Sequence, residues 1–157
     1  MQHLQPQMAQ ILARYRIPVE DAERILEELF LTLHLKRETI TQPDRWLLSS
    51  LKNRCLIFWR SRREQFCRAL DLGLLSMLSS PEVPASERAD ARVRIAALSS
   101  RLSASCRQRI ERRYGLADAD GICEPEERLD PEMLRCLIAL SRRMVNEGAL
   151  APEARDA

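Results

Sequence analysis

The stretch Pro43-Asp-Arg-Trp-Leu-Leu-Ser-Ser-Leu-Lys-Asn-Arg-Cys-Leu-Ile-Phe-Trp-Arg-Ser-Arg-Arg63 combines an apolar stripe with a row of cations. At about 100° per residue, one face gathers side chains of core character: Leu47, Leu48, Leu51, Cys55, Phe58 and Trp59. The opposite face gathers Ser49, Lys52, Asn53, Leu56, Arg60 and Arg63. This spacing predicts an amphipathic helix from Pro43 to about Leu70.

The cation row has two interpretations. Cations along one side of a helix can follow a phosphate backbone, while neighbouring aromatic rings stack on unpaired bases. In the simpler interpretation the cations form a solvated face and Trp46 and Trp59 are core residues, which composition alone favours. The row is therefore a candidate nucleic-acid surface that needs support from other parts of the chain.

Composition predicts an all-α protein. The chain has 157 residues, 45% hydrophobic and 31% charged, enough for one compact domain or two small helical ones. Glycine is scarce, Leu, Ala, Arg and Glu abound, and runs of alternating β-branched residues are missing. The net charge of +2 identifies no partner, because acidic residues gather at 20–28 and basic residues at 52–68.

Upstream of the quoted stretch we predict helices at 5–15 and 19–36, separated by Ile17-Pro18. One face of the second helix carries Val19, Ala22, Ile25, Leu26, Leu29, Phe30 and Leu33. Leu31 and Leu35 lie on the opposite, charged face, where they are either covered by a neighbouring helix or offered to a partner. Residues 37–43 are expected to form a loop.

Downstream, the two prolines within residues 79–86 predict an extended linker between two helical modules. The expected organisation is a helical domain at 1–70, a linker at 71–90, a second domain at 91–146 and a frayed tail at 147–157. The second domain is expected to contain helices at 87–102, at 103–115 with a serine cap and a glycine stop, and at 131–146.

The residue inventory argues against several kinds of function. The five cysteines, at positions 55, 67, 106, 123 and 136, have no zinc-site spacing, so we expect buried or reduced thiols, no metal and no cofactor. Recognisable catalytic motifs and glycine-rich phosphate loops are missing, so we expect no enzyme. With no leader and no bilayer-spanning apolar run, the expected location is the cytoplasm, without membrane contact.

Residues 14–68 resemble the second conserved region of the extracytoplasmic-function group of bacterial sigma factors, the small promoter-specificity subunits of RNA polymerase. The resemblance depends on several short motifs in order: Arg14-Tyr15-Arg16-Ile17-Pro18, Asp21-Ala22-Glu23, Leu29-Phe30-Leu31, Pro43, Trp46-Leu47, Asn53-Arg54-Cys55 and Trp59-Arg60-Ser61-Arg62-Arg63. It implies that core RNA polymerase and single-stranded promoter DNA of the minus-ten region are partners. An anti-sigma protein is a further candidate partner.

The resemblance also implies site residues. The acidic helix would dock on the clamp helices of the largest polymerase subunit through Glu20, Glu23, Glu27 and Leu31. The loop would capture a flipped base through Thr39, Ile40 and Thr41 together with Asn53. The basic helix would hold the melted strand through Lys52, Trp59, Arg60 and Arg63. A trapped base and a stacked strand recover part of the unpairing energy.

In the second domain, Leu98–Leu102, Cys106-Arg107 and Arg112–Leu116 resemble the start of that family's fourth region, whose helix-turn-helix reads duplex DNA. The continuation at 118–132 is acidic and would repel phosphates. Either Arg135 and Arg142 replace the usual contacts, or this truncated module no longer binds duplex, which we favour. The prediction is a sigma-like initiation factor; the alternative is a helical protein that binds polymerase or a regulator without directing initiation.

Overall fold

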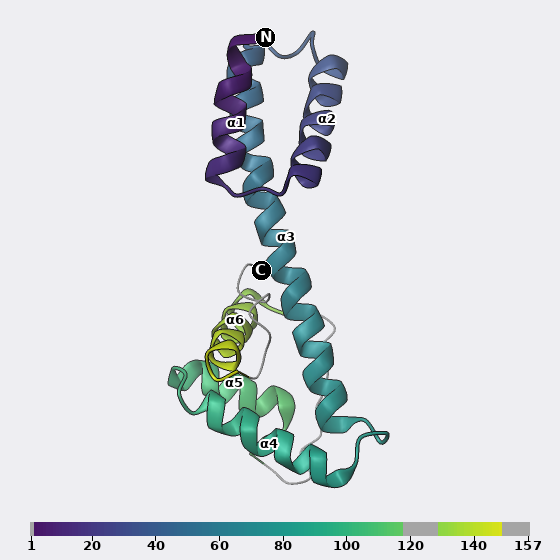
Figure 1. Cartoon of the computed structure of the whole chain (residues 1–157), viewed down its shortest axis with the longest axis vertical. Helices are drawn as coiled ribbons and strands as arrows, with labels where there is room; N and C mark the ends of the chain where they lie inside the picture. The colour runs from purple at the N-terminus through teal and green to yellow at the C-terminus, as the bar shows by residue number, and fades with distance from the viewer. Residues whose placement is uncertain (1, 118–128, 149–157) are drawn as a thin grey trace. The chain divides into compact units, whose positions relative to one another are not determined.

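The computed structural model describes residues 2–117 and 129–148, and within these it contains helices and no strand, which confirms the all-α class. The elements are a 3-10 helix η1 (Gln2–Leu4) and the α-helices α1 (Gln5–Arg14), α2 (Val19–Leu35), α3 (Pro43–Ser79), α4 (Ala85–Ser99), α5 (Ala104–Tyr114) and α6 (Pro131–Asn146) (Figure 1). The chain divides into two compact units, and the division falls after Ser61, inside α3.

The first unit is built around the stripe of α3 that the sequence predicts. Leu47, Leu51 and Cys55 are at most 1% exposed, and Leu48 and Phe58 pack against them. The helices α1 and α2 flank this part of α3 (Figure 1) and add Leu4, Met8, Ile25 and Leu29 to the core. Burial raises the pKa of the Cys55 thiol, which therefore stays protonated and packs as a small apolar group.

Two members of the predicted core face of α2 are exposed instead. Val19 is 74% exposed because it begins the helix, six residues before Ile25, the first residue of α2 that the core reaches. Phe30 is 36% exposed and lines an open pocket. The amphipathic pattern therefore predicts the burial of Ile25 and Leu29 correctly, but not that of Val19 and Phe30.

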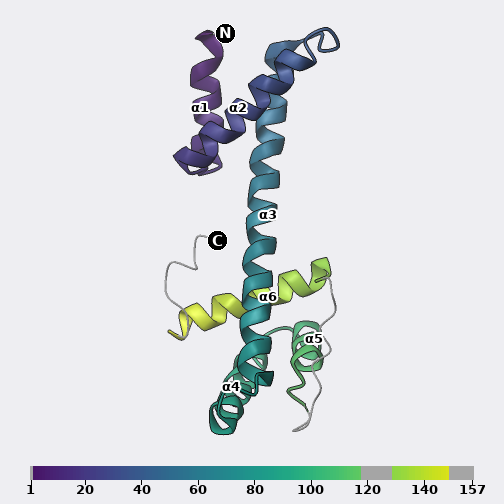
Figure 2. The same cartoon turned by 90° about the vertical axis from the view of Figure 1, so that its right-hand side faces the viewer.

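The second unit packs the C-terminal part of α3 with α4, α5 and α6. Figure 2 shows α6 running across the direction of this part of α3. The core contains Cys67, Leu74, Leu78, Ala91, Ile95, Leu98, Ile110, Tyr114, Met133, Cys136, Leu137 and Leu140. Because Leu74 and Leu78 continue the buried stripe, α3 extends to Ser79, and the prediction that it ends near Leu70 is wrong.

The non-helical connection is consequently much shorter than the predicted linker at 71–90. Residues 71–79 belong to α3, and α4 begins at Ala85 after the N-cap residue Pro84, so only residues 80–84 connect the two helices. The two prolines do mark a break between helices, as expected from their missing N–H groups. They do not mark the division between the compact units, which lies after Ser61.

A buried carboxylate joins α3 to α5 within the second unit. Asp71 is 5% exposed and accepts hydrogen bonds of 2.7 Å from Nε and Nη2 of Arg113 and from the hydroxyl of Tyr114. Burial, reinforced by the bond to Asp71, raises the pKa of Tyr114, so its hydroxyl remains a neutral donor. The charge of Asp71 is thus matched by two groups that are themselves shielded from water.

The caps of α5 are those predicted. The Ser103 side chain accepts from the backbone N–H of Cys106, and Gly115 ends the helix in the left-handed region with φ 59°. The end of α1 uses the same left-handed geometry without glycine, because Arg16 has φ 50°. There, Ile17 N–H donates to Leu12 O at 3.1 Å and Arg16 N–H to Ala13 O at 3.0 Å, a Schellman motif.

The cysteines require one correction. Cys106 and Cys136, expected as reduced thiols, form a disulfide between α5 and α6, whose helices bring residues 30 apart in sequence into contact. Cys55 and Cys67 are free and buried, as expected, and burial raises the pKa of Cys67 to about 11. Cys123 and the predicted tail beyond Gly148 lie outside the described residues. None of the described helices combines the length and apolar character needed to cross a bilayer.

Candidate nucleic-acid interface

The candidate interface in the first unit begins with the cation row of α3. Lys52, Asn53 and Arg60 are exposed, and neither Lys52 nor Arg60 pairs with an acidic side chain among the described residues. Arg63, also exposed and without such a pair, belongs to the second unit. The cations are therefore free to meet phosphates without first breaking an ion pair.

Sequence reasoning missed one member of this row. Arg45 is exposed, has no acidic partner among the described residues, and lies seven residues before Lys52, two helical turns away on the same side of α3. The periodicity that selected Lys52 would have found it, had the pattern been followed back into the first helical turn. We call Arg45, Lys52 and Arg60 the α3 strip.

Two other arginines of the first unit, Arg24 and Arg54, differ from the α3 strip because they are paired. Arg24 lies 2.7 Å from Asp21, and Arg54 lies 3.6 Å from Glu28 on α2. Between Lys52 and Arg60, Leu56 and Ile57 are 52% and 43% exposed, so apolar surface lies beside the free cations. That combination suits a ligand with charged and flat apolar parts, such as single-stranded nucleic acid.

Trp59 takes a different position from the one expected of a freely stacking ring. Its indole Nε1 donates a 2.7 Å hydrogen bond to the backbone oxygen of Tyr15, and the residue is half-buried. Its ring meets that of Phe58 edge to face, with centroids 5.3 Å apart. Trp59 therefore fixes the end of α1 to α3, and only its remaining exposed surface is available to a ligand.

The loop after α2 borders a pocket of about 370 Å³. Its lining is formed by Phe30, Leu33, His34, Arg37, Ile40 and Pro43. The loop is shaped by Lys36, whose carbonyl accepts from the N–H groups of Thr39 and Ile40 and from the Thr39 hydroxyl. An aromatic ring, an imidazole and a guanidinium around one hollow can hold a flat polar ring by stacking and hydrogen bonding.

Only one of the residues predicted for base capture lines this pocket. Ile40 does so, whereas Thr39, Thr41 and Asn53 are exposed and are not part of the lining. Phe30, His34 and Arg37 take the positions that the prediction gave to those polar side chains. Phe30 and His34 are four residues apart on α2, a spacing that places them on one helical face and could have indicated them.

The predicted docking surface lies on the exposed face of α2. Glu20, Glu23 and Glu27 are exposed and have no cationic partner among the described residues. Leu31 and Leu35 are 60% and 74% exposed, so no neighbouring helix of the first unit covers them. Carboxylates followed by two leucines form a surface with an acidic end and an apolar end, which fits a basic, partly apolar protein partner.

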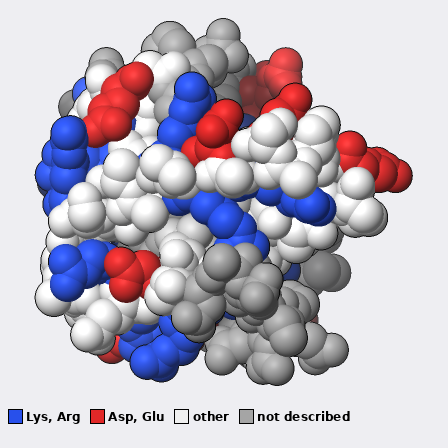
Figure 3. All heavy atoms as spheres, turned by 90° about the horizontal axis from the view of Figure 1, so that it is seen from below, with Lys and Arg blue, Asp and Glu red and all other residues white. Residues whose placement is uncertain are grey.

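The arginines of the second unit are mostly engaged within it. Arg113 binds Asp71, Arg109 binds Asp130 and Glu132, and Arg101 lies 2.6 Å from Glu147. Figure 3 shows basic and acidic side chains interspersed on the face that it presents. Arg135 and Arg142 of α6 are exposed, whereas the acidic residues at 118–128 lie outside the described residues.

In comparisons with known proteins, no family model, no curated protein and no solved structure matches the chain. The interface is therefore defined by its own chemistry. It consists of unpaired cations beside apolar surface on α3, a pocket with aromatic and cationic walls at the end of α2, and an acidic-apolar face on α2.

Proposed function

We propose that this chain is a sigma-like transcription initiation factor that docks on core RNA polymerase and binds the opened minus-ten strand of a promoter. The observation that carries the proposal is the α3 strip, whose cations are exposed and unpaired while Arg24 and Arg54 of the same unit are paired. Unpaired cations release condensed counterions when they meet phosphates, and this release supplies much of nucleic-acid affinity.

The pocket beside the loop supports a single-stranded substrate over a duplex. A base inside a duplex cannot enter a pocket without being extruded, whereas a base of an opened strand enters at a smaller cost. Ile40 and Phe30 would contact the faces of such a base, and Arg37 would supply a hydrogen-bond donor or a neighbouring phosphate contact. No bond is made or broken in this process, so the proposal does not involve an enzyme.

The proposed polymerase-docking surface is negatively charged, in contrast to the positively charged α3 strip. The acidic-apolar face of α2, with Glu20, Glu23, Glu27 and Leu31, would meet a basic helical surface of the polymerase. Exposed leucines next to unpaired carboxylates give both affinity and orientation to such an interface. The site of action would be the cytoplasm, where promoter and polymerase are found.

For the second unit we propose that duplex binding has been lost. Arg101, Arg109 and Arg113 are paired with carboxylates of the same unit, which removes them from the free cations that a recognition helix needs. On α6, Arg135 and Arg142 would provide two phosphate contacts, too few by themselves for strong binding.

The proposal is tested by fluorescence anisotropy of a labelled AT-rich single strand, with and without bacterial core RNA polymerase. We expect binding by the free protein at low salt and tighter binding when core polymerase is present. Leu31→Asp should abolish the effect of polymerase and leave direct DNA binding intact. The matched control is Val93→Asp, which places the same charge at a 70% exposed apolar position of α4.

The alternative function is a helical protein that binds polymerase or a regulator without acting on DNA. The exposed Leu31 and Leu35 favour it, because they form a partner surface whether or not DNA is bound. The same experiment separates the two functions. Polymerase binding that Leu31→Asp removes, together with no DNA binding under any condition, would establish the alternative and exclude the initiation factor.

A further inference from the structure

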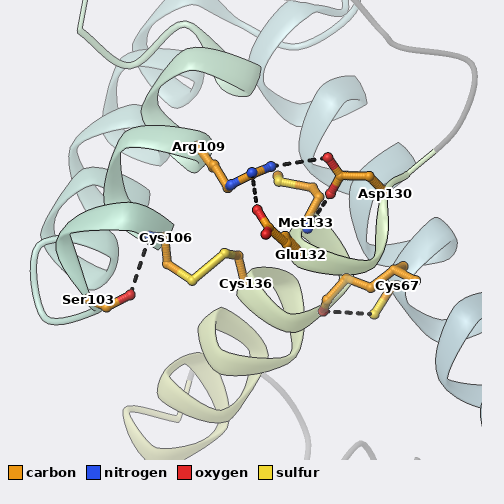
Figure 4. The surroundings of a disulfide bond; sticks show 9 residues. Cys67, Ser103, Cys106, Arg109, Asp130, Glu132, Met133 and Cys136 are labelled. Carbon is orange, nitrogen blue, oxygen red and sulfur yellow. Dashed lines mark hydrogen bonds and ion pairs between the residues drawn. A yellow bond between two sulfur atoms is a disulfide. The ribbon is translucent and has the colours of Figure 1, made fainter.

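The disulfide between Cys106 and Cys136 lies in the second unit and has no part in the proposed function. It joins the first turn of α5 to α6, with the two Cα atoms 5.1 Å apart (Figure 4). Cys136 is 3% exposed, whereas Cys106 is half-buried. A reagent from solution therefore reaches Cys106 more readily than Cys136.

The two helices are also held together without the disulfide. Arg109, one turn after Cys106, binds Asp130 at 3.1 Å and also binds Glu132, and both carboxylates lie at the start of α6 (Figure 4). Ile110 of α5 and Leu137 of α6 are fully buried in the same core. If the sulfur–sulfur bond is cleaved, these contacts keep the two thiols close, at a high effective concentration.

Cys106 is placed to react as a thiolate. It is the third residue of α5, after the N-cap residue Ser103 and within the turn whose N–H groups point out of the helix end. Thiolates are stabilised at helix N-termini. Cys55 and Cys67 differ, since both are 0% exposed and burial raises the pKa of each thiol, to about 11 for Cys67.

We propose that Cys106 and Cys136 form a reversible dithiol–disulfide pair that exchanges with low-molecular-weight disulfides and thereby clamps or releases the second unit. This goes beyond the proposed function and does not depend on it. In the oxidising direction, the Cys106 thiolate attacks one sulfur of a small disulfide. A mixed disulfide forms, the small disulfide bond breaks, and one small thiolate leaves.

The second step closes the pair. Cys136 loses its proton and attacks the Cys106 sulfur, so that the protein disulfide forms, the mixed disulfide breaks and a second small thiolate leaves. The two protein thiols are oxidised by two electrons, which reduce the small disulfide to two thiols. Reduction follows the same steps in reverse, beginning with attack by a small thiolate on the accessible Cys106 sulfur.

The test uses the full chain carrying Cys123→Ser, so that all remaining cysteines lie in the described part. The protein is equilibrated in glutathione buffers of varying ratio, quenched in acid, labelled with a maleimide after unfolding and digested for mass spectrometry. We expect one transition for the Cys106–Cys136 pair, with the same midpoint from the oxidised and the reduced side. Cys55 and Cys67 should be thiols throughout.

Two results would overturn the proposal. If Cys106 and Cys136 are labelled by maleimide at every buffer ratio, they form no disulfide. If they stay bonded in the most reducing buffer, the disulfide is a fixed cross-link. Because neither result involves DNA or polymerase, failure here is distinct from failure of the proposed function.

The role of the Arg109 contacts is tested by a matched pair of variants on α5. Arg109→Gln removes the cation that binds Asp130 and Glu132, and Arg112→Gln removes an exposed cation that binds no carboxylate among the described residues. We expect Arg109→Gln to lower the equilibrium constant for disulfide formation about threefold, and Arg112→Gln to leave it unchanged. Equal constants for both variants would contradict the holding role of Arg109.

Hydrogen exchange measures whether the disulfide clamps the second unit. In the oxidised protein, amides of Ala104–Tyr114 should exchange at least severalfold more slowly than in the reduced protein, while amides of α1 and α2 should be unaffected. Equal exchange in α5 in both redox states would show that the bond forms without clamping the unit.

Discussion

Single residues decide how two helices of this protein end. Arg16 and Gly115 both adopt the left-handed conformation just after a helix, with φ 50° and 59°. Glycine is the residue that accepts this geometry without strain, so Gly115 could be predicted from the sequence. Arg16 could not, because nothing in an arginine signals the conformation, and the nearby proline marks only that the helix stops.

Arg16→Gly should therefore stabilise the first unit by about 1 kcal/mol, since it removes the strain of a β-carbon in the left-handed region. Urea unfolding followed by tryptophan fluorescence measures this, because Trp46 and Trp59 both belong to the first unit. Arg14→Gly is the control. It places glycine inside the last turn of α1 and should destabilise by about the same amount.

Asp71 is the residue with the largest expected effect in the second unit. Asp71→Asn removes the charge that faces the Arg113 guanidinium, whose side chain is 8% exposed. An uncompensated buried charge should cost about 3 kcal/mol or more. Hydrogen exchange of peptides from α5 under native conditions reports this loss. Arg112→Ala on the same helix should change the exchange little, and a similar loss in both variants would contradict the assignment.

At the scale of helices, periodicity predicted faces better than ends. The buried stripe of Leu47, Leu51 and Cys55 follows from spacing alone. The end of α3 could not be predicted from spacing. Leu74 and Leu78 are buried by α4 to α6, and those contacts come from distant parts of the chain. The disulfide escaped prediction for the same reason, because it depends on which helices meet.

The start of α6 provides a pH-dependent test. The bond from the Met133 N–H, assisted by Arg109, lowers the pKa of Asp130 below its ordinary value of 3.8. A lowered pKa means that the stabilisation is present above pH 3.8 and is lost as the pH falls through the lowered value.

Asp130→Asn keeps a side-chain cap but cannot titrate. We expect the native protein to have a higher melting temperature than this variant at pH 6 and the difference to disappear well below pH 3.8, in thermal unfolding followed by circular dichroism. A difference that stays constant over this range would rule out the titrating cap.

At the scale of the whole molecule, the two units use their charges differently. In the first unit, neither the α3 strip nor the α2 carboxylates Glu20, Glu23 and Glu27 have an oppositely charged partner within residues 2–117 and 129–148. In the second unit Arg101, Arg109 and Arg113 bind carboxylates of the same unit. We infer that the first unit supplies the partner-binding surfaces, because the free cations of its α3 strip lie beside the exposed Leu56 and Ile57.

The sequence predicted the fold class more completely than the candidate site. The all-α class followed from composition, and the exposure of Lys52 and Arg60 from helical spacing. The sequence predicts base capture at the loop after α2, where the structure has a pocket, but Thr39 and Thr41, chosen because their hydroxyls are good donors, are not part of its lining.

The most direct measurement is the salt dependence of binding to single-stranded DNA, compared between Lys52→Ala plus Arg60→Ala and Arg135→Ala plus Arg142→Ala. Both double variants remove two positive charges, so net charge is matched. If the α3 strip holds phosphates, the first should lower the slope of log K against log salt by about 1.4, and the second should leave it unchanged. Equal slopes for both variants and the native protein would contradict the account.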